Sequence, residues 1–468
     1  MTAATGPSGW QRDDPAAGEQ PALGSDTEAE VVVVGAGLAG LALAHHLARH
    51  LPPDSILVLE AGRAGGGASG RSTGICGPGV GGPITAQLRR YGPDLARRMF
   101  DASLQGIAAL RRLAGELPGD CELTETYQLV AASTPAHAAR LLRRAETLRD
   151  VLGFDVGYLD RARTAQRLGT DRYHGALCYP DVAMVNPWLL CQKLKRALLD
   201  AGVRIAERTA VTAVAGGDPA TLTAAGHVVR ARRVALATDG FTPALNLFRR
   251  NVATVRTHVL RTEVVRPDLL ARTGWDGRGT FIDSRNFFNY VRLTARGRLL
   301  FGGGPALLDD RASAGDVAAV RSRLGRELAA VFPALAGVEV TDFWSGITAS
   351  TFDRLPIVGS VPGKPGVWFA GAWCGHGLAL SALTAERLAP ALAGLDPGAG
   401  LDPGAGLDPG PELPWQRGRS GWMPSGRVGG ALLSAYLRGL EIADRAAVAR
   451  PGTRPASPAG ARSRAGRP

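Results

Sequence analysis

The sequence predicts an α/β domain combined with an α+β domain that is built on an antiparallel sheet. Two observations support this fold class. Short, uninterrupted apolar runs, typical of parallel strands buried on both faces, occur at residues 31–34, 56–59, 234–238 and 367–370. By contrast, residues 252–304 alternate between apolar and polar, which is typical of antiparallel strands. Because the apolar runs are spread over the chain, we expect a discontinuous α/β domain.

Residues 29–62 form the first predicted unit, a strand, a helix and a second strand. Its turn carries Gly35, Gly37 and Gly40 at G-x-G-x-x-G spacing, and the second strand ends on Glu60. In such a unit the glycines allow a tight turn, close approach of the backbone to a pyrophosphate, and close packing of helix against strand. The acid accepts hydrogen bonds from a ribose. This pattern predicts an adenine-dinucleotide site rather than a chance glycine turn. We assign to it Gly35, Gly37, Leu38, Ala39, Gly40, Glu60 and Ala61.

A glycine-rich stretch, residues 62–82, follows this unit and suits neither a helix nor a strand. Beside a dinucleotide site, such a loop is more often a binding loop than a flexible linker, which is the alternative. Its backbone N–H groups would surround and bind a phosphate, and Ser69, Arg71 and Ser72 would add polar contacts.

Composition limits the functional classes. The 468 residues are enough for two domains, and five of the arginines behind the net charge of +12 lie after residue 445, in a segment without acids. We therefore expect no nucleic-acid-binding face. The five scattered cysteines form no C-x-x-C pair, which predicts a reducing cytoplasm and no metal site. A transmembrane helix over residues 31–48 is disfavoured by its glycines and histidines, and the polar amino-terminus shows no secretion signal.

The domain boundaries follow from these patterns. We expect the α/β domain to comprise residues 29–84, 181–245 and 343–393. Residues 85–180, mainly, and the antiparallel strands in residues 246–342 would form the second domain. The remaining segments are expected to be a disordered leader (1–28), a low-complexity GLDPGA insert (394–412), a closing helix (413–446) and a disordered basic tail (447–468).

Several motifs, taken together, resemble a known family. After the opening unit come GASGRSTG (67–74), an NP helix (186–200), ALATDGFTP (235–243), FWSGITASTFDRLPIVG (343–359) and GAWCGHGLA (371–379). In this order they resemble the FAD-dependent D-amino-acid oxidase superfamily over roughly residues 30–390. The GASGR loop is most similar to the gamma-glutamylputrescine oxidoreductase branch, although GRST departs from the GRNGG form common there. The resemblance implies a discontinuous Rossmann-like FAD-binding domain and a substrate domain with an antiparallel sheet.

The resemblance also implies FAD rather than a nicotinamide cofactor, and it extends the set of cofactor-binding residues. It adds Ala68, Ser69, Arg71, Ser72 and Gly74 in the first loop, then Val211, Ala237 and Thr238, and finally Gly371, Gly375, His376 and Gly377 beside the flavin ring. A helix beginning near Leu378 would direct its positive end at the ring. Sarcosine oxidases attach flavin to a cysteine that would fall near Gly346–Thr348, where this chain has none, so noncovalent FAD is expected.

The candidate catalytic and substrate-binding residues are His376, Tyr290 and Arg292. Tyr290 and Arg292 are two residues apart on one strand, where they would bind a substrate carboxylate, unless this is only a solvated face. We expect His376 at the flavin edge, with a plain loop histidine or a catalytic base as alternatives. His258 and Asp353 are further candidates, although Asp353 is more typical of a turn.

The implied reaction is oxidation of a C–N bond in an amine or amino acid, including polyamine derivatives of the gamma-glutamylputrescine type. Hydride would pass to flavin N5, water would hydrolyse the imine, and oxygen would reoxidise the flavin. Three alternatives stay open: a dehydrogenase that uses a quinone or carrier, an RNA-associated flavoprotein suggested by the basic tail, and a nicotinamide-dependent dehydrogenase. Expected partners are a small-molecule substrate and an electron acceptor, with no nucleic acid and no membrane span. The sequence does not identify the amine.

Overall fold

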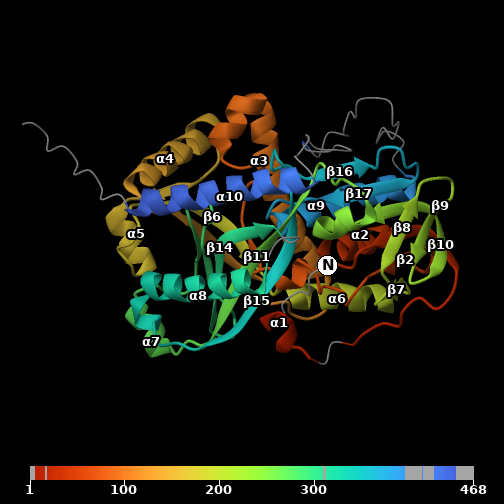
Figure 1. Ribbon diagram of the computed structural model, residues 1–468, viewed down its shortest axis with the longest axis horizontal. Coiled ribbons are helices and arrows are strands. Elements are labelled where there is room, and N and C mark those ends of the chain that lie inside the picture. The colour runs from red at the N-terminus through yellow and green to blue at the C-terminus, as the bar shows by residue number, and fades with distance from the viewer. Residues whose placement is uncertain (1–5, 16–17, 309–312, 396–413, 415–425, 450–468) are drawn as a thin grey trace, which may run out of the picture.

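The computed structural model describes residues 6–15, 18–308, 313–395, 414 and 426–449. The described chain forms two sheets, one of eight and one of nine strands, which lie side by side in Figure 1. One is largely parallel and the other largely antiparallel, so the predicted fold class is confirmed.

The eight-stranded sheet has the order β16-β17-β10-β1-β2-β7, and a β8–β9 hairpin extends from β10. Strand β1 pairs in parallel with both β2 and β10, and its four consecutive valines are at most 4% exposed. Its strands are β1 (Thr27–Val34), β2 (Ile56–Leu59), β7 (Arg204–Ala206), β8 (Val211–Ala215), β9 (Ala220–Ala224), β10 (His227–Leu236), β16 (Ile357–Ser360) and β17 (Val367–Gly371). Because β1, β2, β10 and β17 run in parallel, their carboxyl ends share one edge of the sheet.

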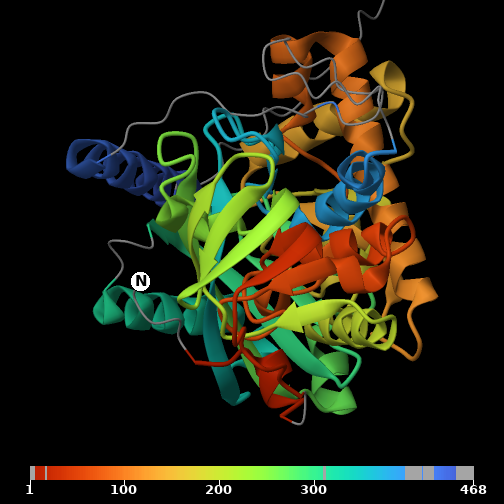
Figure 2. The same cartoon turned by 90° about the vertical axis from the view of Figure 1, so that its right-hand side faces the viewer.

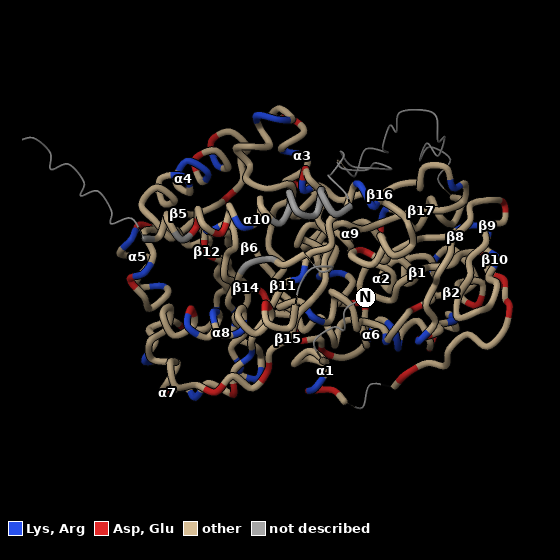
Figure 3. The backbone as a smooth tube through the Cα atoms, in the orientation of Figure 1, with Lys and Arg blue, Asp and Glu red and all other residues tan. Residues whose placement is uncertain are grey.

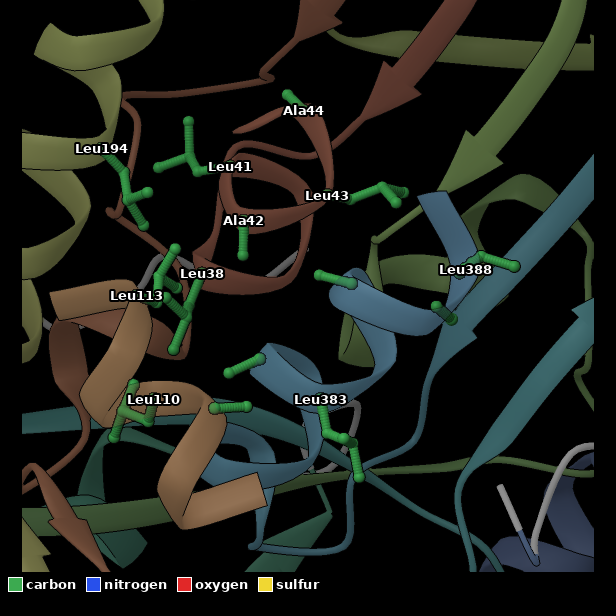
Figure 4. Packing of buried hydrophobic residues seen from close by; sticks show 14 of the residues in the cluster. Leu38, Leu41, Ala42, Leu43, Ala44, Leu110, Leu113, Leu194, Leu383 and Leu388 are labelled. Atoms are coloured by element: carbon green, nitrogen blue, oxygen red, sulfur yellow. The ribbon is translucent and has the colours of Figure 1, made fainter. Parts of the chain in front are cut away.

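Four helices pack together against this sheet. They are α2 (Leu38–Leu47), α3 (Ile84–Glu116), α6 (Pro187–Asp200) and α9 (Gly377–Ala393). Figure 4 shows α2 among the others, with Leu194 of α6 on one side, Leu110 and Leu113 of α3 below, and Leu383 of α9 nearby. Small residues on α2, among them Ala42 and Ala44, are fully buried in this cluster. The core therefore fixes the amino-terminus of α2 and of α9 relative to the sheet edge.

The nine-stranded sheet has the order β15-β11-β14-β13-β12-β4-β6-β3, with β5 beside β6. Its strands are β3 (Ile75–Cys76), β4 (Thr124–Ala131), β5 (Gly157–Leu159), β6 (Ala176–Met184), β11 (Ala253–Val264), β12 (Thr280–Asp283), β13 (Tyr290–Leu293), β14 (Arg298–Leu308) and β15 (Val340–Ser350). Strand β15 pairs along its length with β11. The prediction that residues 343–350 belong to the α/β domain is therefore wrong for this strand.

Helices also accompany the nine-stranded sheet. They are α4 (Pro135–Glu146), α5 (Arg161–Leu168), α7 (Pro267–Thr273), α8 (Ala314–Val331) and α10 (Gly426–Ala449). In Figure 2, α10 and α8 lie at the left edge, and Arg323 of α8 forms an ion pair with Glu441 of α10 at 2.7 Å. The predicted closing helix therefore runs to Ala449, three residues into the predicted tail. Most of the insert and tail lies outside the described residues.

The predicted disordered leader is wrong for residues 6–15 and 18–28, which are folded against the protein. A short helix, α1 (Gly9–Arg12), carries Trp10, which is 2% exposed. Asp13 forms an ion pair with Arg261 at 2.6 Å, and Asp14 accepts a hydrogen bond from Trp188 at 3.0 Å. Hydrogen bonds and ion pairs with distant residues hold this segment. The sequence here has few apolar residues, so no local pattern predicts the packing.

Candidate cofactor and substrate site

A continuous cavity of about 1640 Å³ lies between the two sheets. One part of its wall comes from the carboxyl edge of the parallel strands, including the β1–α2 turn and Glu60 after β2. Another part comes from the antiparallel sheet, including Thr257 of β11 and Tyr290 of β13. The cavity exceeds the usual volume of about 300–1,000 Å³ for a single small-ligand pocket, so it suits a dinucleotide together with a substrate.

The β1–α2 turn approaches its neighbours so closely that glycine is required. Gly35 has a φ of +101°, and a Cβ there would lie 2.8 Å from the carbonyl oxygen of Ala237. A Cβ on Gly40 would collide with the carbonyl oxygen of Gly35, which lies in the preceding turn. Gly37 lines the cavity and precedes α2, whose first N–H groups have no backbone acceptor within the helix. This turn therefore forms an anion cradle.

Glu60 lies beside the cradle, as the sequence predicts. Its Oε2 accepts a hydrogen bond from the backbone N–H of Ala36 at 2.8 Å, and Oε1 accepts one from Gly62 at 2.8 Å. Burial raises the pKa of the Glu60 carboxyl, and these two N–H groups oppose that rise. The carboxyl group is thereby held on the cavity wall, in position to accept hydrogen bonds from a ligand's hydroxyl groups.

The glycine-rich loop after β2 is a fixed wall of the cavity and not a slack linker. Ser69 Oγ accepts a hydrogen bond from the N–H of Leu38 at 2.8 Å, which joins the loop to α2. Arg71 donates through Nε to the carbonyl oxygen of Gly66 at 2.9 Å and through Nη1 to that of Ser345 at 3.1 Å. Arg71 therefore ties the loop to β15 of the other sheet.

The loop between β17 and α9 forms the facing wall. Asp239 fixes this loop, because its Oδ1 accepts a hydrogen bond from the N–H of Ala372 at 2.8 Å and its Oδ2 one from Ala349 at 3.1 Å. Burial raises the pKa of the Asp239 carboxyl. His376 follows on the cavity wall, directly before α9, whose first residue Gly377 also lines the cavity. The amino-terminus of a 17-residue helix therefore lies at the cavity.

The sequence matches that of a known family. Residues 30–391 match the family model "FAD dependent oxidoreductase" (DAO). The chain belongs to the DAO family of FAD-dependent oxidoreductases.

Individual proteins with similar sequences support the membership of this chain in the DAO family. The chain is 28% identical over 383 residues to a probable oxidoreductase OrdL of Haemophilus influenzae, covering 80% of this chain and 85% of that protein. It is 28% identical over 375 residues to the gamma-glutamylputrescine oxidoreductase of Escherichia coli, again covering 80% and 85%. The fold resembles that of the glycine oxidase of Geobacillus kaustophilus, with a TM-score of 0.66, 24% identity, and coverage of 80% and 97%.

The site fits FAD, the cofactor of the family, because the glycine cradle and Glu60 match the needs of its adenosine diphosphate part. Most of the predicted cofactor residues line the cavity: Gly35, Gly37, Leu38, Ala39, Glu60, Ala61, Ala68, Ser69, Arg71, Ser72, Val211, Ala237, Thr238, Gly375, His376 and Gly377. Three predicted residues do not, which are Gly40, Gly74 and Gly371. They instead allow close packing, since a Cβ on Gly371 would lie 2.6 Å from the Phe369 ring.

Arg292 is not positioned to bind a substrate, and that prediction is wrong. It is 1% exposed, does not line the cavity, and donates through Nη1 to the carbonyl oxygens of Thr73 at 3.0 Å and Val185 at 2.9 Å. Burial lowers the pKa of Arg292 to about 10, and its guanidinium lies 5.7 Å from the Trp10 ring centroid. The arginine fastens the cofactor loop to the second sheet.

The other candidates take different positions. Tyr290 lines the cavity, but its hydroxyl donates to the carbonyl oxygen of His258 at 2.9 Å. His258 lies outside the cavity, fully buried, and its Nδ1 is 2.9 Å from Ser345 Oγ. Asp353 is a turn residue whose Oδ1 accepts a hydrogen bond from Leu355 at 3.2 Å. Among these, only Tyr290 and His376 lie on the cavity wall.

Sequence reasoning missed a group of basic side chains around the cavity. The arginines on its wall, besides Arg63 and Arg71, are Arg89, Arg140, Arg143, Arg144, Arg285 and Arg354. A signal was available on α4, where His137, Arg140, Leu141 and Arg144 follow the i, i+3, i+4, i+7 spacing of one helix face and all line the cavity. Figure 3 shows basic residues recurring along α4. Arginines at helical spacing usually indicate a solvated face, so their place on the cavity wall was not predicted.

Proposed function

We propose that this protein uses FAD to oxidise an amine or amino acid at the carbon next to its nitrogen. The observation that carries the proposal is the continuous cavity, which joins the cradle at Gly35 and Glu60 to a polar end with His376 and Tyr290. A cofactor that fills the cradle end leaves the polar end for a small substrate.

Named relatives favour an amine or amino-acid substrate. They include the gamma-glutamylputrescine oxidoreductase, the glycine oxidase at 26% identity over 365 residues and a sarcosine oxidase subunit beta at 24% over 343 residues. Each of these names contains an amine or an amino acid. We extend that shared chemistry, and not any one substrate, to this chain.

When bound, FAD supplies the acceptor for the hydride that leaves the carbon. The chain must hold the amine unprotonated, because a protonated amine has no lone pair to assist this loss. Burial, together with the nearby charges of Arg144 and Arg354, lowers the pKa of His376 to about 4, so its imidazole is neutral at pH 7. The same positive surroundings would lower the pKa of a bound amine. The amino-terminus of α9 would stabilise negative charge near His376.

We propose that the cofactor is held without a covalent bond. Gly346, Ile347 and Thr348 line the cavity, and none of them is a cysteine. Cys76 also lines it, but burial raises the pKa of that thiol to about 12, which disfavours the thiolate. Precipitating the denatured protein with acid should leave the flavin in solution, and yellow colour in the pellet would contradict this.

We favour oxygen over a quinone or carrier protein, and the cytoplasm over other compartments because the five cysteines of the chain are all free. None of the described helices is both long and apolar enough to cross a bilayer. In the described part of the chain, no group of three or more His, Cys, Asp or Glu side chains is placed to hold a metal ion.

An anaerobic titration tests the proposal. The yellow protein is mixed with amino acids, N-methyl glycines, polyamines or glutamylated amines while its absorbance is followed near about 450 nm. We expect one class to bleach the flavin, and admitting air should then restore the colour rapidly if oxygen is the acceptor. Failure of every class to bleach a correctly loaded protein would overturn the proposed function. Slow recovery in air would instead favour the dehydrogenase.

A further inference from the structure

We propose that the substrate carries an uncharged hydrogen-bonding group, a hydroxyl or an amide, on the chain beyond its oxidised nitrogen, and that Gln128 binds this group. The assignment rests on the proposed function, because Gln128 would select among substrates in the same cavity. Three features of Gln128 point to this role: its position on the cavity wall, an amide that lacks a partner, and uncharged neighbours.

Gln128 places an amide on the cavity face of β4. Side chains alternate along a strand, and Leu129 and Ala131 pack into the core on one face, while Gln128 and Val130 line the cavity on the other. Gln128 is 7% exposed, so its side chain is almost fully removed from bulk solvent. An apolar side chain of similar length would fill the same space without burying an amide.

The Gln128 amide makes no hydrogen bond to any residue in the described part of the chain. It offers one acceptor oxygen and two donor N–H groups. The loop directly in front of it supplies no partner, although a Cβ on Gly77 would lie only 2.6 Å from Gln128 Oε1. The N–H of Gly79 in the same loop is already used, since it donates to Ser103 Oγ at 2.9 Å. Leaving a buried amide unpaired is costly, which favours a ligand that supplies the missing partner.

The same loop connects Gln128 with the polar end of the cavity. Gly79 lies beside His376, because a Cβ on Gly79 would be 3.7 Å from His376 Cε1. Gly77 and Gly79 are two residues apart, so their Cα atoms are separated by at most about 7 Å. Gln128 and His376 therefore line the cavity within the length of a small extended ligand. A substrate with its nitrogen near His376 can place a group several bonds away at Gln128.

The residues next to Gln128 on this sheet face are uncharged. Tyr179 of β6 and Thr280 of β12 lie in register with it on the two neighbouring strands, and Val130 lies two residues along β4. A carboxylate or an ammonium group at Gln128 would lose its hydration and gain no opposite charge from these neighbours. A hydroxyl or an amide replaces the hydrogen bonds of the water that it displaces, whereas a hydrocarbon does not. Gln128 therefore favours a substrate with an uncharged polar arm.

Binding of matched amines tests the inference without turnover. The full-length protein is loaded with FAD and reduced with dithionite, so that the flavin accepts no hydride, and binding is measured by anaerobic calorimetry. Heptylamine, 6-amino-1-hexanol and N-acetyl-1,4-diaminobutane have equal chain lengths, but they carry a hydrocarbon, a hydroxyl and an amide arm. For each polar amine we compare its Kd with that of heptylamine, because this Kd ratio removes effects that are common to all three.

Gln128→Met keeps the length of the side chain and removes its hydrogen-bonding groups. For at least one polar amine, the Kd ratio should rise by about fivefold or more in this variant, which corresponds to the loss of one neutral hydrogen bond. A rise for N-acetyl-1,4-diaminobutane identifies an amide arm, and a rise for 6-amino-1-hexanol a hydroxyl arm. Gln128→Leu is a second apolar replacement, for use if Gln128→Met does not fold.

Leu129→Met is the matched control. Leu129 is the next residue of β4, but it packs into the core and does not line the cavity. This change should leave the Kd ratios within about twofold of their original values, since it removes no hydrogen bond. Melting temperatures show whether each variant is folded.

Four outcomes would overturn the inference. They are no binding of any of the amines, Kd ratios that stay unchanged in the folded Gln128 variant, an equal rise in Leu129→Met, and a weaker affinity for FAD in place of a changed ratio. The last outcome would assign Gln128 to the cofactor.

Failure of the proposed function looks different. In that case no amine or amino acid would bleach the oxidised flavin, yet the reduced protein would still distinguish polar from apolar amines through Gln128. Conversely, amines that bleach the flavin with Kd ratios independent of Gln128 would support the oxidation and reject the role of this residue.

Discussion

Trp10 donates its indole N–H to the carbonyl oxygen of Ser72 at 2.9 Å. Ser72 belongs to the loop that lines the cofactor cavity, while Trp10 lies seventeen positions before Thr27, the first residue of β1. Ser8 adds a second hydrogen bond from its Oγ to the carbonyl oxygen of Gly70 at 2.7 Å. The amino-terminal segment therefore supports the cofactor loop from behind.

Replacing Trp10 should therefore weaken FAD binding more than it weakens the fold. Trp10→Phe keeps an aromatic ring but removes the indole N–H and its hydrogen bond. We therefore expect the free energy of FAD binding to weaken by about 1 kcal/mol, which is a rise of about fivefold in the Kd for FAD. Flavin fluorescence on adding FAD to the apoprotein measures this. Trp275→Phe is a suitable control, because Trp275 packs 5.5 Å from Phe332 in the other core and lies outside the cavity. Equal effects of both changes would contradict the support role.

Much of the fold, but not this support, was predictable from sequence. The strand of four valines and the spaced glycines carry local signals, since period and turn chemistry depend on neighbours in the chain. Ser8 and Trp10, in contrast, contact residues 62 positions away through hydrogen bonds. A polar segment held by distant carbonyl groups has the same local composition as a disordered one, so sequence alone could not separate them.

Gly40 should be the least replaceable glycine of the cradle. In Gly40→Ala the new Cβ collides with the backbone oxygen of Gly35, which cannot rotate away. We expect a loss of about 3 kcal/mol in unfolding free energy and loss of FAD binding, measured by urea denaturation and by absorbance. Gly325→Ala in α8 is the control, since nothing lies within 4 Å of its added Cβ. That change should be neutral or stabilise by up to about 1 kcal/mol. Similar behaviour of the two variants would refute the packing argument.

Arg292 illustrates why the substrate site was harder to predict. Alternation along β13 places Tyr290 and Arg292 on the same sheet face, but it does not show what covers that face. Over Tyr290 the face is open to the cavity, whereas over Arg292 it is covered by the turn at Thr73 and by Val185. What covers a face depends on segments far apart in the chain, and for the same reason the place of the α4 arginines on the cavity wall was not predicted.

Arg292→Met should consequently reduce stability rather than substrate affinity. Two buried carbonyl oxygens lose their donor, and we expect a decrease of about 3 kcal/mol in unfolding free energy. At a temperature where the variant remains folded, the KM for an acidic substrate should stay within about twofold of its original value, because Arg292 does not line the cavity. A large rise in KM without a loss of stability would restore the substrate-binding role.

His258 should make the protein less stable in mild acid. Burial, and then the charge of Arg256, lowers the pKa of this fully buried imidazole to about 4. The unfolded chain binds a proton below pH of about 6.5 while the folded chain does not, so stability is lost as pH falls from about 6.5 towards 4. This residue alone should account for about 2 kcal/mol between pH 7 and pH 5.

Urea denaturation at pH 7 and pH 5 measures that loss. His258→Gln should reduce the difference between the two pH values, even if it lowers stability at both. His50→Gln, which changes an exposed histidine, should leave the difference as it is. If His258→Gln leaves the pH dependence intact, the titrating group is elsewhere, for example at His376 or His46, whose pKa values are also lowered to about 4.

Asp444 connects the last helix to the substrate end of the cavity. Its Oδ1 accepts hydrogen bonds from the N–H and the side-chain Nδ2 of Asn286, both at 2.9 Å, and its Oδ2 accepts one from the N–H of Phe287 at 3.0 Å. Asn286 and Phe288 line the cavity, so α10 fixes a segment of its wall. Asp444→Ala should release that segment, because two backbone N–H groups lose a charged acceptor worth about 2 kcal/mol.

Hydrogen exchange at Asn286 and Phe287 should therefore become about tenfold to thirtyfold faster in Asp444→Ala, since exchange reports the free energy of local opening. The KM should rise while the melting temperature changes little, because the core lies elsewhere. Glu441→Gln is the matched control on the same helix, as its ion pair with Arg323 does not involve the cavity wall. Unchanged exchange in Asp444→Ala would mean that the segment is held by β12 and β13 alone, and that α10 covers the sheet without shaping the site.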